Sequence, residues 1–345
     1  TAWASSRSDG RGVVILRGDD AGAIAQAAEA LARGELIGLP TETVYGLGAD
    51  AASDAAVAGV YAAKNRPADH PLIVHVTGAD RVGEFAHDVP DFAARLIDAF
   101  WPGPLTLILP RRPDRAAAAA GGQDSIGLRC PSHPVAQAIL QAAWARGVHG
   151  VAAPSANRFG RVSPTTAAHV ADELGPELLV IDGGPCEVGI ESTIIDCTRG
   201  VPVLLRPGLL PAAALEAAAG ERLRGPGDPG LAEAAAPRAS GTLASHYAPQ
   251  AKVVLMEAPQ LQAALDALTP DRPAPAVYAR TPCRVAPGTV VQQLAMPRSA
   301  ADAAHDLFAV LRALDATGVP EIWIERPPAD AEWDGVRDRL QRAAA

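Results

Sequence analysis

Short apolar runs alternate with amphipathic stretches over the first two thirds of the chain, a pattern that predicts strands separated by helices. We expect strands at Val13–Leu16, Leu36–Leu39, Leu72–Val76, Leu105–Leu109, Ile126–Arg129 and Val151–Ala153, and at residues 178–181, 192–196 and 203–206. We expect helices over residues 20–33, 53–64, 90–100, 134–144 and 163–174. Several strands are joined by loops too short for a crossover helix, so a mixed sheet of about eight strands is predicted.

Three of these helices begin at residues that commonly cap a helix. Asp19 or Asp20 precedes the first, Ser53 precedes the second and Ser163 precedes the last. Each of these side chains can accept a hydrogen bond from a free amide of the first turn. The free amides of a helix starting at Ser163-Pro164 would favour an anion, although a simple capped loop explains the same residues.

From Lys252 onward the pattern changes to regular alternation. We expect strands at 253–256, 276–279, about 289–291 and 321–325, and helices at 259–268, 299–316 and 333–342. This spacing predicts a small parallel, doubly wound domain. We therefore divide the chain into a disordered lead-in (1–12), a first domain (13–210), a Pro/Gly/Ala-rich linker that covers the active site (211–250) and a second domain (251–345).

Composition narrows the function classes. The 345 residues carry a net charge of −9, which argues against a protein dominated by nucleic-acid binding but allows a local cationic pocket. The four cysteines form no C-x-x-C pair, so we expect neither a zinc ribbon nor a disulfide framework, and a reducing cytoplasm is the expected setting. No apolar run approaches the roughly 20 residues of a membrane span, so no membrane partner is expected.

The basic residues are very unevenly divided. Of the 30 lysines and arginines, only Lys64 and Lys252 are lysine. Lys64 lies two residues before Arg66 at a predicted helix end, where the two cations can converge on a phosphate. Helix C-termini also attract cations without any ligand, which is the simpler alternative.

A second polar segment, PTETVYGLGADA, lies between a predicted strand and helix. Its Gly46-x-Gly48-x-x-Ala51 spacing, with Asp69 further on, matches a loose dinucleotide fingerprint, and an oxidoreductase is one alternative. The glycines come too late after the strand for that motif, and an ordinary loop is a further alternative. Ligands of α/β proteins bind at such strand ends, and the threonines of this segment supply hydroxyl donors.

Further candidate residues lie within or at the ends of other predicted strands, or in loops: His75, Arg129, Ser155, Asn157, Ser192, Thr193, Arg206, His246 and Tyr247. A core histidine at 75, ordinary strand residues at 192 and 193, and a surface charge at 206 are the alternatives. The chain has no G-x-x-x-x-G-K, G-x-S-x-G or H-E-x-x-H motif. From the residues alone we predict an α/β anion-binding enzyme whose reaction is not specified.

Seven segments together resemble the threonylcarbamoyl-AMP synthase family in its long, two-domain form. They are PTETVYGLGADA, KNRP with HPLIVHV, WPGPLTLIL, IGLRCPSHP, APSAN-FG-VSPT, GIESTIID and LRPG, in the family's order over about residues 13–210, and HYAP follows in the linker. The resemblance implies a YrdC-like open, curved mixed sheet flanked by helices, plus a smaller Rossmann-like parallel α/β domain. It also implies synthesis of L-threonylcarbamoyladenylate and pyrophosphate from L-threonine, bicarbonate and ATP, with Mg²⁺ accompanying the nucleotide.

The resemblance also assigns roles to residues. Lys64 and Arg66 would be catalytic, and no side chain would serve as a dedicated metal ligand. L-Threonine or its carbamate would be held by Thr41, Thr43, His75, Ser192 and Thr193. The nucleotide would be held by Lys64, Arg66, His70, Arg129, Ser155, Asn157, Ser163, Arg206, His246 and Tyr247. Residues 240–245 read SGTLAS, where many members have a more basic run, so this part of the linker departs from the family.

The implied product serves tRNA threonylcarbamoyladenosine modification in the cytoplasm, through a downstream tRNA threonylcarbamoyl-transferase complex. Whether the chain binds tRNA directly is left open. Two alternatives remain: a carbamoyl-transfer maturation enzyme, and an RNA-binding module of the same fold.

Overall fold

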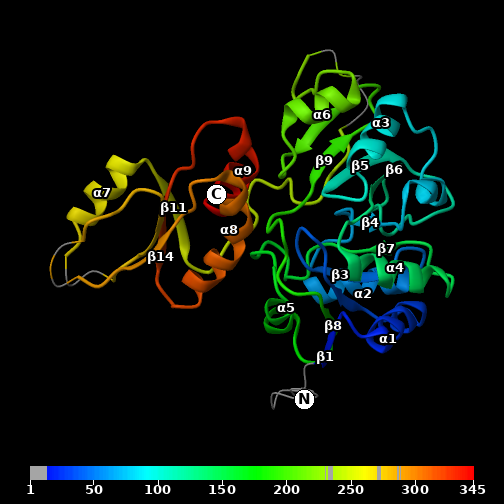
Figure 1. Cartoon of the computed structure of the whole chain (residues 1–345), viewed down its shortest axis with the longest axis horizontal. Coiled ribbons are helices and arrows are strands. Elements are labelled where there is room, and N and C mark those ends of the chain that lie inside the picture. The colour runs from blue at the N-terminus through cyan, green and yellow to red at the C-terminus, as the bar shows by residue number, and fades with distance from the viewer. Residues whose placement is uncertain (1–13, 230, 232–235, 270–272, 286, 288) are drawn as a thin grey trace.

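The computed structural model describes residues 14–229, 231, 236–269, 273–285, 287 and 289–345, so the predicted lead-in at 1–12 lies outside the described residues. The chain forms two lobes, a larger one built from the first two thirds of the sequence and a smaller one built from the last third (Figure 1). The predicted α/β class is confirmed in both.

The larger lobe is organised around a ten-stranded mixed sheet among the described residues, in the order β1-β8-β2-β3-β7-β4-β6-β5-β9-β10. Its strands are β1 (Val14–Arg17), β2 (Ile37–Leu39), β3 (Gly46–Asp50), β4 (Ile73–His75), β5 (Leu105–Pro110), β6 (Ser125–Arg129), β7 (Val151–Ala152), β8 (Leu179–Asp182), β9 (Thr193–Asp196) and β10 (Val203–Arg206). Its helices are α1 (Ala21–Ala32), α2 (Asp54–Lys64), α3 (Asp91–Phe100), α4 (Pro134–Trp144), α5 (Ala167–Leu174) and α6 (Ala212–Ala219), with a 3₁₀ turn η1 at Ala79–Glu84.

The central strands bury one face and leave the other for a ligand site. On β4, Val74 belongs to the main hydrophobic core, whereas Ile73 and His75 line a cavity on the opposite face. On β6, Leu128 faces the core and Arg129 faces the cavity. The twofold side-chain alternation of a strand therefore accounts for apolar and polar residues following one another here.

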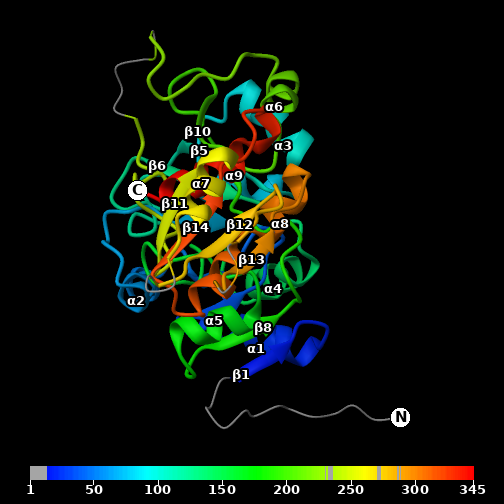
Figure 2. The ribbon, with the colours of Figure 1, turned by 90° about the vertical axis from the view of Figure 1, so that its left-hand side faces the viewer.

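The smaller lobe contains a four-stranded, wholly parallel sheet in the order β11-β14-β12-β13. Its elements are β11 (Lys252–Met256), α7 (Ala258–Asp266), β12 (Ala276–Ala279), β13 (Gln292–Ala295), α8 (Ala300–Asp315), β14 (Glu321–Glu325), a 3₁₀ turn η2 (Ala331–Trp333) and α9 (Asp334–Ala343). Helix α7 packs on one face, and α8 and α9 pack on the other, between the small sheet and the larger lobe (Figures 1 and 2).

Three local predictions were wrong. Residues 46–50, expected to be loop, form strand β3, which pairs antiparallel with β2 and β7. The helix expected to begin at Ser163 begins at Ala167, because Thr166 accepts the capping hydrogen bond from the amide of His169. The edge strand expected near 289–291 is β13, which lies slightly later in the chain.

The dinucleotide interpretation of the glycines is also wrong, because they lie in a strand. A Cβ on Gly46 would lie 3.0 Å from the Cβ of Ala153, so glycine allows the close approach of β3 to the chain that follows β7.

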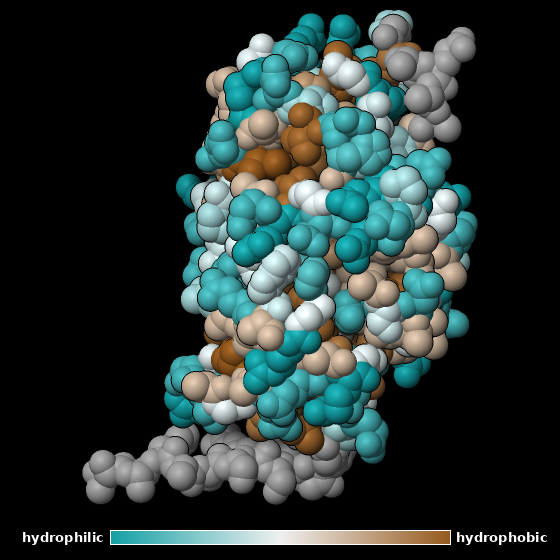
Figure 3. Space-filling model, turned by 90° about the vertical axis from the view of Figure 1, so that its right-hand side faces the viewer, coloured by the Kyte–Doolittle hydropathy of each residue, from teal (hydrophilic) through white to brown (hydrophobic). Residues whose placement is uncertain are grey.

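Polar and apolar residues are interspersed over the face shown in Figure 3, with a small apolar group near its upper end. In the part of the chain that the structure describes, no helix has the length and apolar character needed to cross a membrane. All four cysteines are unpaired thiols.

Candidate functional site

A cavity lies on the open face of the large sheet, beneath the linker. Its walls come from strand ends and loops far apart in the sequence: the segment after β2, the end of α2, β4, β6, the loop after β7, the segment before β9, the end of β10 and the linker. Of the sequence-predicted site residues, it brings together Thr41, Thr43, Lys64, Arg66, His75, Arg129, Ser155, Asn157, Ser192, Arg206, His246 and Tyr247.

His70, Ser163 and Thr193 are not among the residues that line this cavity. His70 packs edge-to-face on Phe159, which does line it, with ring centres 5.3 Å apart. Thr193 is fully buried beside Gly208 and follows Ser192, so strand alternation turns the two side chains to different faces. Ser163 lies just behind the cavity wall, where its Oγ donates to Oε1 of Glu191 over 2.5 Å.

Arg129 anchors one end of the cavity. Its Nη2 lies 2.6 Å from Oε1 of Glu42 in a buried ion pair, and its Nη1 donates to Oγ1 of Thr43 over 2.7 Å. The Oγ1 of Thr43 in turn lies 2.9 Å from the Oγ1 of Thr41. Burial alone would raise the pKa of Glu42, but Arg129 holds it below its ordinary value, so the pair stays ionised. The arrangement fixes a guanidinium and two hydroxyls in a pocket shielded from water.

His75 lies at the end of β4, next to β6, with only 3% of its surface exposed. Its Nδ1 has no hydrogen-bond partner in the described part of the chain. Burial, helped by the positive charge of Arg129, lowers the pKa of His75 to about 3. The imidazole is therefore neutral at physiological pH and offers a free ring nitrogen to the cavity.

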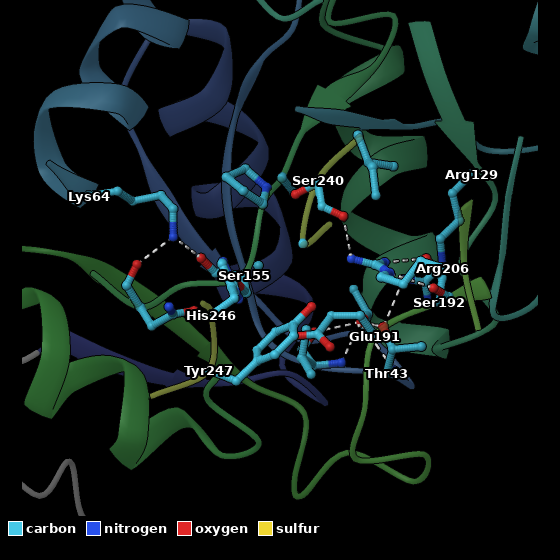
Figure 4. A pocket seen from close by; sticks show the side chains of 18 of the residues that line it. Thr43, Lys64, Arg129, Ser155, Glu191, Ser192, Arg206, Ser240, His246 and Tyr247 are labelled. Atoms are coloured by element: carbon cyan, nitrogen blue, oxygen red, sulfur yellow. Dashed lines mark hydrogen bonds between the residues drawn. The ribbon is translucent and has the colours of Figure 1, made fainter. Parts of the chain in front are cut away.

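Lys64 lies on the side of the cavity away from Arg129 and Arg206 (Figure 4). Only 1% of its surface is exposed, and its Nζ donates to the main-chain carbonyls of Ser155, over 2.5 Å, and Asn157. Burial, followed by repulsion from Arg66, places its pKa well below the ordinary value. The amino group of Lys64, at the end of α2, therefore lies inside the cavity wall.

Arg66 and Arg206 complete the cationic lining. Nη2 of Arg66 donates to the carbonyl of Pro71 over 2.9 Å. Arg206 donates to the carbonyl of Ser192 over 3.0 Å, to its Oγ over 3.2 Å and to the carbonyl of Ser240 over 2.9 Å. Burial lowers the pKa of Arg66 to about 10 and also lowers that of Arg206.

None of the three cations Lys64, Arg66 and Arg206 forms an ion pair with a carboxylate of the described residues; their partners are carbonyls and hydroxyls. A buried charge is stable only when it is compensated. The cavity therefore carries a surplus of positive charge that suits a polyanion.

The linker closes the cavity from above. Ser240, Gly241, His246 and Tyr247 all line it. Tyr247 adopts a left-handed backbone (φ 61°) and stacks on Phe308 of α8. Nδ1 of His246 has no hydrogen-bond partner among the described residues, and burial lowers the pKa of His246 to about 3. In the SGTLAS run, the main-chain carbonyl of Ser240 accepts a hydrogen bond from Nη1 of Arg206 over 2.9 Å.

Sequence reasoning missed two carboxylates. Glu42 was only part of a polar loop, and Glu191 only part of the GIESTIID string. Glu191 lines the cavity and is bound by Arg339 of α9, whose Nε donates to Oε2 over 2.9 Å. The sequence signal for each is a glutamate inside an otherwise apolar or hydroxyl-rich segment. A glutamate is seldom buried unless it is paired, so this pattern indicates a cationic partner in the fold.

The fold and the cavity define an α/β protein with a cavity lined by cationic side chains on the open face of a mixed sheet. Residues 29–208 match the family described as "Telomere recombination" (Sua5_yciO_yrdC), and residues 210–345 match the family described as "Threonylcarbamoyl-AMP synthase, C-terminal domain".

Individual relatives agree. Threonylcarbamoyl-AMP synthase of Pyrococcus abyssi is 42% identical over 235 residues, covering 68% of this chain and 68% of the relative. That of Bacillus subtilis is 41% identical over 237 residues, covering 68% and 66%. The crystal structure of P. abyssi Sua5 complexed with L-threonine superposes with a TM-score of 0.84 at 33% identity, covering 96% of this chain and 97% of that one.

The chain belongs to the threonylcarbamoyl-AMP synthase family, in its two-domain form. The family, the fold class and the synthase function expected from the sequence are confirmed.

Proposed function

We propose that this cavity is where the chain makes L-threonylcarbamoyladenylate and pyrophosphate from L-threonine, bicarbonate and ATP. The observation that carries the proposal is the group of three buried cations, Lys64, Arg66 and Arg206, none of which forms an ion pair with a carboxylate of the described residues. A triphosphate supplies the missing negative charge, with forked contacts from the arginines and a point charge from the lysine.

In this proposal the amino-acid end lies around Arg129, which the resemblance had assigned to the nucleotide. Its charge is partly neutralised by Glu42, which suits a single carboxylate better than a polyphosphate. Thr41 and Thr43 supply hydroxyls, and the neutral His75 supplies a free ring nitrogen. Ser192 lies between this group and Arg206, and its Oγ is 2.7 Å from that of Thr106.

The proposed chemistry proceeds in two steps. Bicarbonate gives up hydroxide to form CO₂, and the amine nitrogen of threonine bonds to its carbon and loses a proton; the product is a carbamate, and the proton and hydroxide leave as water. An oxygen of the carbamate then bonds to the α-phosphorus of ATP as the bond to pyrophosphate breaks. Both steps depend mainly on holding the reactants together and neutralising the phosphates, which Lys64, Arg66 and Arg206 can do without a side-chain nucleophile.

The nucleotide would enter with Mg²⁺. Among the described residues, no group of three His, Cys, Asp or Glu side chains could hold a metal ion. Mg²⁺ bound mostly by phosphates and water needs few protein ligands, and Oδ1 of Asn157, buried and without a partner, is one oxygen available to it. When bound, Mg²⁺ neutralises part of the phosphate charge.

We further propose that the chain acts in the cytoplasm and that its product passes to a tRNA threonylcarbamoyl-transferase complex. The match of residues 210–345 to the synthase C-terminal domain favours this role over a carbamoyl-transfer maturation enzyme.

The test is pyrophosphate release by the purified chain with ATP, Mg²⁺, bicarbonate and L-threonine. We expect release only when both threonine and bicarbonate are present. Release that continues after either is omitted would show that the reaction is a different one. Salt-sensitive RNA binding without turnover would instead support the RNA-binding alternative.

A further inference from the structure

The C-terminal lobe contributes a buried arginine to the wall of the cavity. Arg339, in the middle of α9, has no exposed surface. Its Nε donates to Oε2 of Glu191 over 2.9 Å, its Nη2 donates to the main-chain oxygen of Glu191 over 3.1 Å, and its Nη1 donates to the carbonyl of Pro207 over 2.7 Å. One side chain of the second lobe therefore holds both the segment before β9 and the turn after β10.

Those two segments carry cavity residues. Glu191 itself lines the cavity, Ser192 follows it, and Arg206 directly precedes Pro207. The other carboxylate oxygen of Glu191 accepts the hydroxyl of Ser163 over 2.5 Å. A shift of Arg339 would consequently move a carboxylate, a serine and an arginine of the site together.

The lobes meet closely around this contact. A Cβ on Gly335 of α9 would lie 2.6 Å from the carbonyl oxygen of Gly208, so the helix backbone rests directly on the turn after β10. Arg312 of α8 donates to the carbonyls of Val162 and Ser163, the latter over 3.3 Å. The second lobe is thus fitted to the rear of the cavity through several independent contacts.

We propose that Arg339 is a positioning residue that acts through Glu191, keeping this carboxylate ionised and oriented in the cavity wall so that Arg206 and Ser192 stay in place for the substrates. The inference rests on the proposed function and deepens it, because it gives the second domain a task in catalysis.

The electrostatics around Glu191 agree with this role. Burial would raise the pKa of Glu191, but Arg339 and then Arg206 hold it below its ordinary value. The charged and titratable groups that interact with it are Arg339 from α9, Arg206 from β10, Lys64 from α2, and His246 and Tyr247 from the linker. Arg339 also pairs with Asp338 of α9, with its Nη1 2.9 Å from Oδ2. Without Arg339, less positive charge offsets the burial of the Glu191 carboxylate, so the pKa of Glu191 rises.

The test is a double-mutant cycle with Arg339→Met, Glu191→Gln and the double variant, each assayed for threonine-dependent pyrophosphate release between pH 6 and 9. We expect Arg339→Met to lower kcat/KM at least tenfold at neutral pH, with a smaller loss at high pH, where Glu191 ionises again. We expect the double variant to fall within about threefold of Glu191→Gln alone, because the carboxylate through which Arg339 acts is then absent and only its bonds to main-chain carbonyls remain.

Arg337→Met is the matched control on the same helix, since the partners of Arg337 among the described residues, the carbonyls of Pro328 and Asp330 and the carboxylate of Asp334, all lie within the second lobe. It should keep the wild-type pH profile. If Arg339→Met does not fold, Arg339→Lys keeps the charge but cannot bond to Glu191 and Pro207 with the same fork. The Arg339→Lys variant should then lose activity, while the acid limb of its pH–activity profile should not move to higher pH.

Two results would overturn the inference while leaving the synthase function intact. One is an Arg339→Met variant with wild-type kcat/KM, or with an equal loss at every pH. The other is a double variant whose loss is the product of the two single losses. A wild-type chain without threonine-dependent release would overturn the proposed function, and this inference with it.

Discussion

The buried histidine at the end of β4 gives a quantitative test of the cavity's electrostatics. We predict that the His75→Gln variant loses less stability than the wild type when the pH is lowered. The pKa of His75 is about 3 in the folded chain, against an ordinary value of about 6.5 in an unfolded one. Between these values the unfolded chain binds a proton that the folded chain does not, so stability falls as the pH is lowered through this window.

The size of the effect follows from the width of the window. Each unit of pKa difference is worth about 1.4 kcal/mol, so lowering the pH from above 7 to 5 costs the wild type about 2 kcal/mol through His75 alone. Above pH 7 the histidine is neutral in both states and contributes no pH dependence. The glutamine variant carries no titrating group at this position.

Urea unfolding of the wild type and of His75→Gln at pH 7.5, 6.5, 5.8 and 5.0 measures the difference directly. The stability gap between the two proteins should be constant above pH 7 and should move by about 2 kcal/mol in favour of the variant by pH 5. His87→Gln, at an exposed position, controls for the loss of one histidine. Parallel stability curves for the wild type and His75→Gln would refute the burial of a neutral imidazole on the cavity face of β4.

Two further substitutions test the phosphate site and the contact between the lobes. Lys64→Ala should abolish pyrophosphate release while the circular dichroism spectrum stays native. Lys252→Ala removes the other lysine, at an exposed position, and should keep full activity. Equal activity of the two variants would contradict the phosphate role of Lys64. Gly189→Ala places a Cβ 2.3 Å from the carbonyl oxygen of His305 at a backbone φ of 81°. Thermal unfolding should show it to be less stable by about 2 kcal/mol or more than Gly200→Ala, which has a similar φ but no atom within 4 Å; equal stability of the two would mean that the lobes do not meet as described.

The sequence allowed the strand ends of the cavity to be predicted well, because apolar runs that stop at a charged residue are local signals. Arg129 ends β6 and Arg206 ends β10, and both side chains line the cavity. Lys64 could be predicted as a phosphate-binding residue for a similar reason, because it is one of only two lysines and lies at the end of a helix.

The buried carboxylates could not be predicted, since their partners are distant in the sequence. Glu42 lies 87 residues before Arg129, and Glu191 lies 148 residues before Arg339. No local pattern shows that a surface-like glutamate will meet an arginine in the interior. Such pairs depend on the packing of whole elements, here α9 against the turn after β10.

Strand β3 and the start of α5 were missed for opposite reasons. Gly46 and its neighbours have weak strand propensity, and their strand is stabilised by pairing on both sides with β2 and β7. At α5 the local signal was too permissive, because Ser163 and Thr166 can both cap a helix. Ser163 instead bonds to Glu191, which leaves Thr166 as the cap.

The most direct test of the proposed synthase reaction is the identity of the product formed with ¹³C-labelled bicarbonate. We predict that mass spectrometry of a reaction containing ATP, Mg²⁺, L-threonine and labelled bicarbonate will show an adduct of threonine, one labelled carbon and AMP, formed in step with pyrophosphate. An adenylate of threonine that carries no label, or pyrophosphate release without any threonine-containing nucleotide, would contradict the proposed reaction.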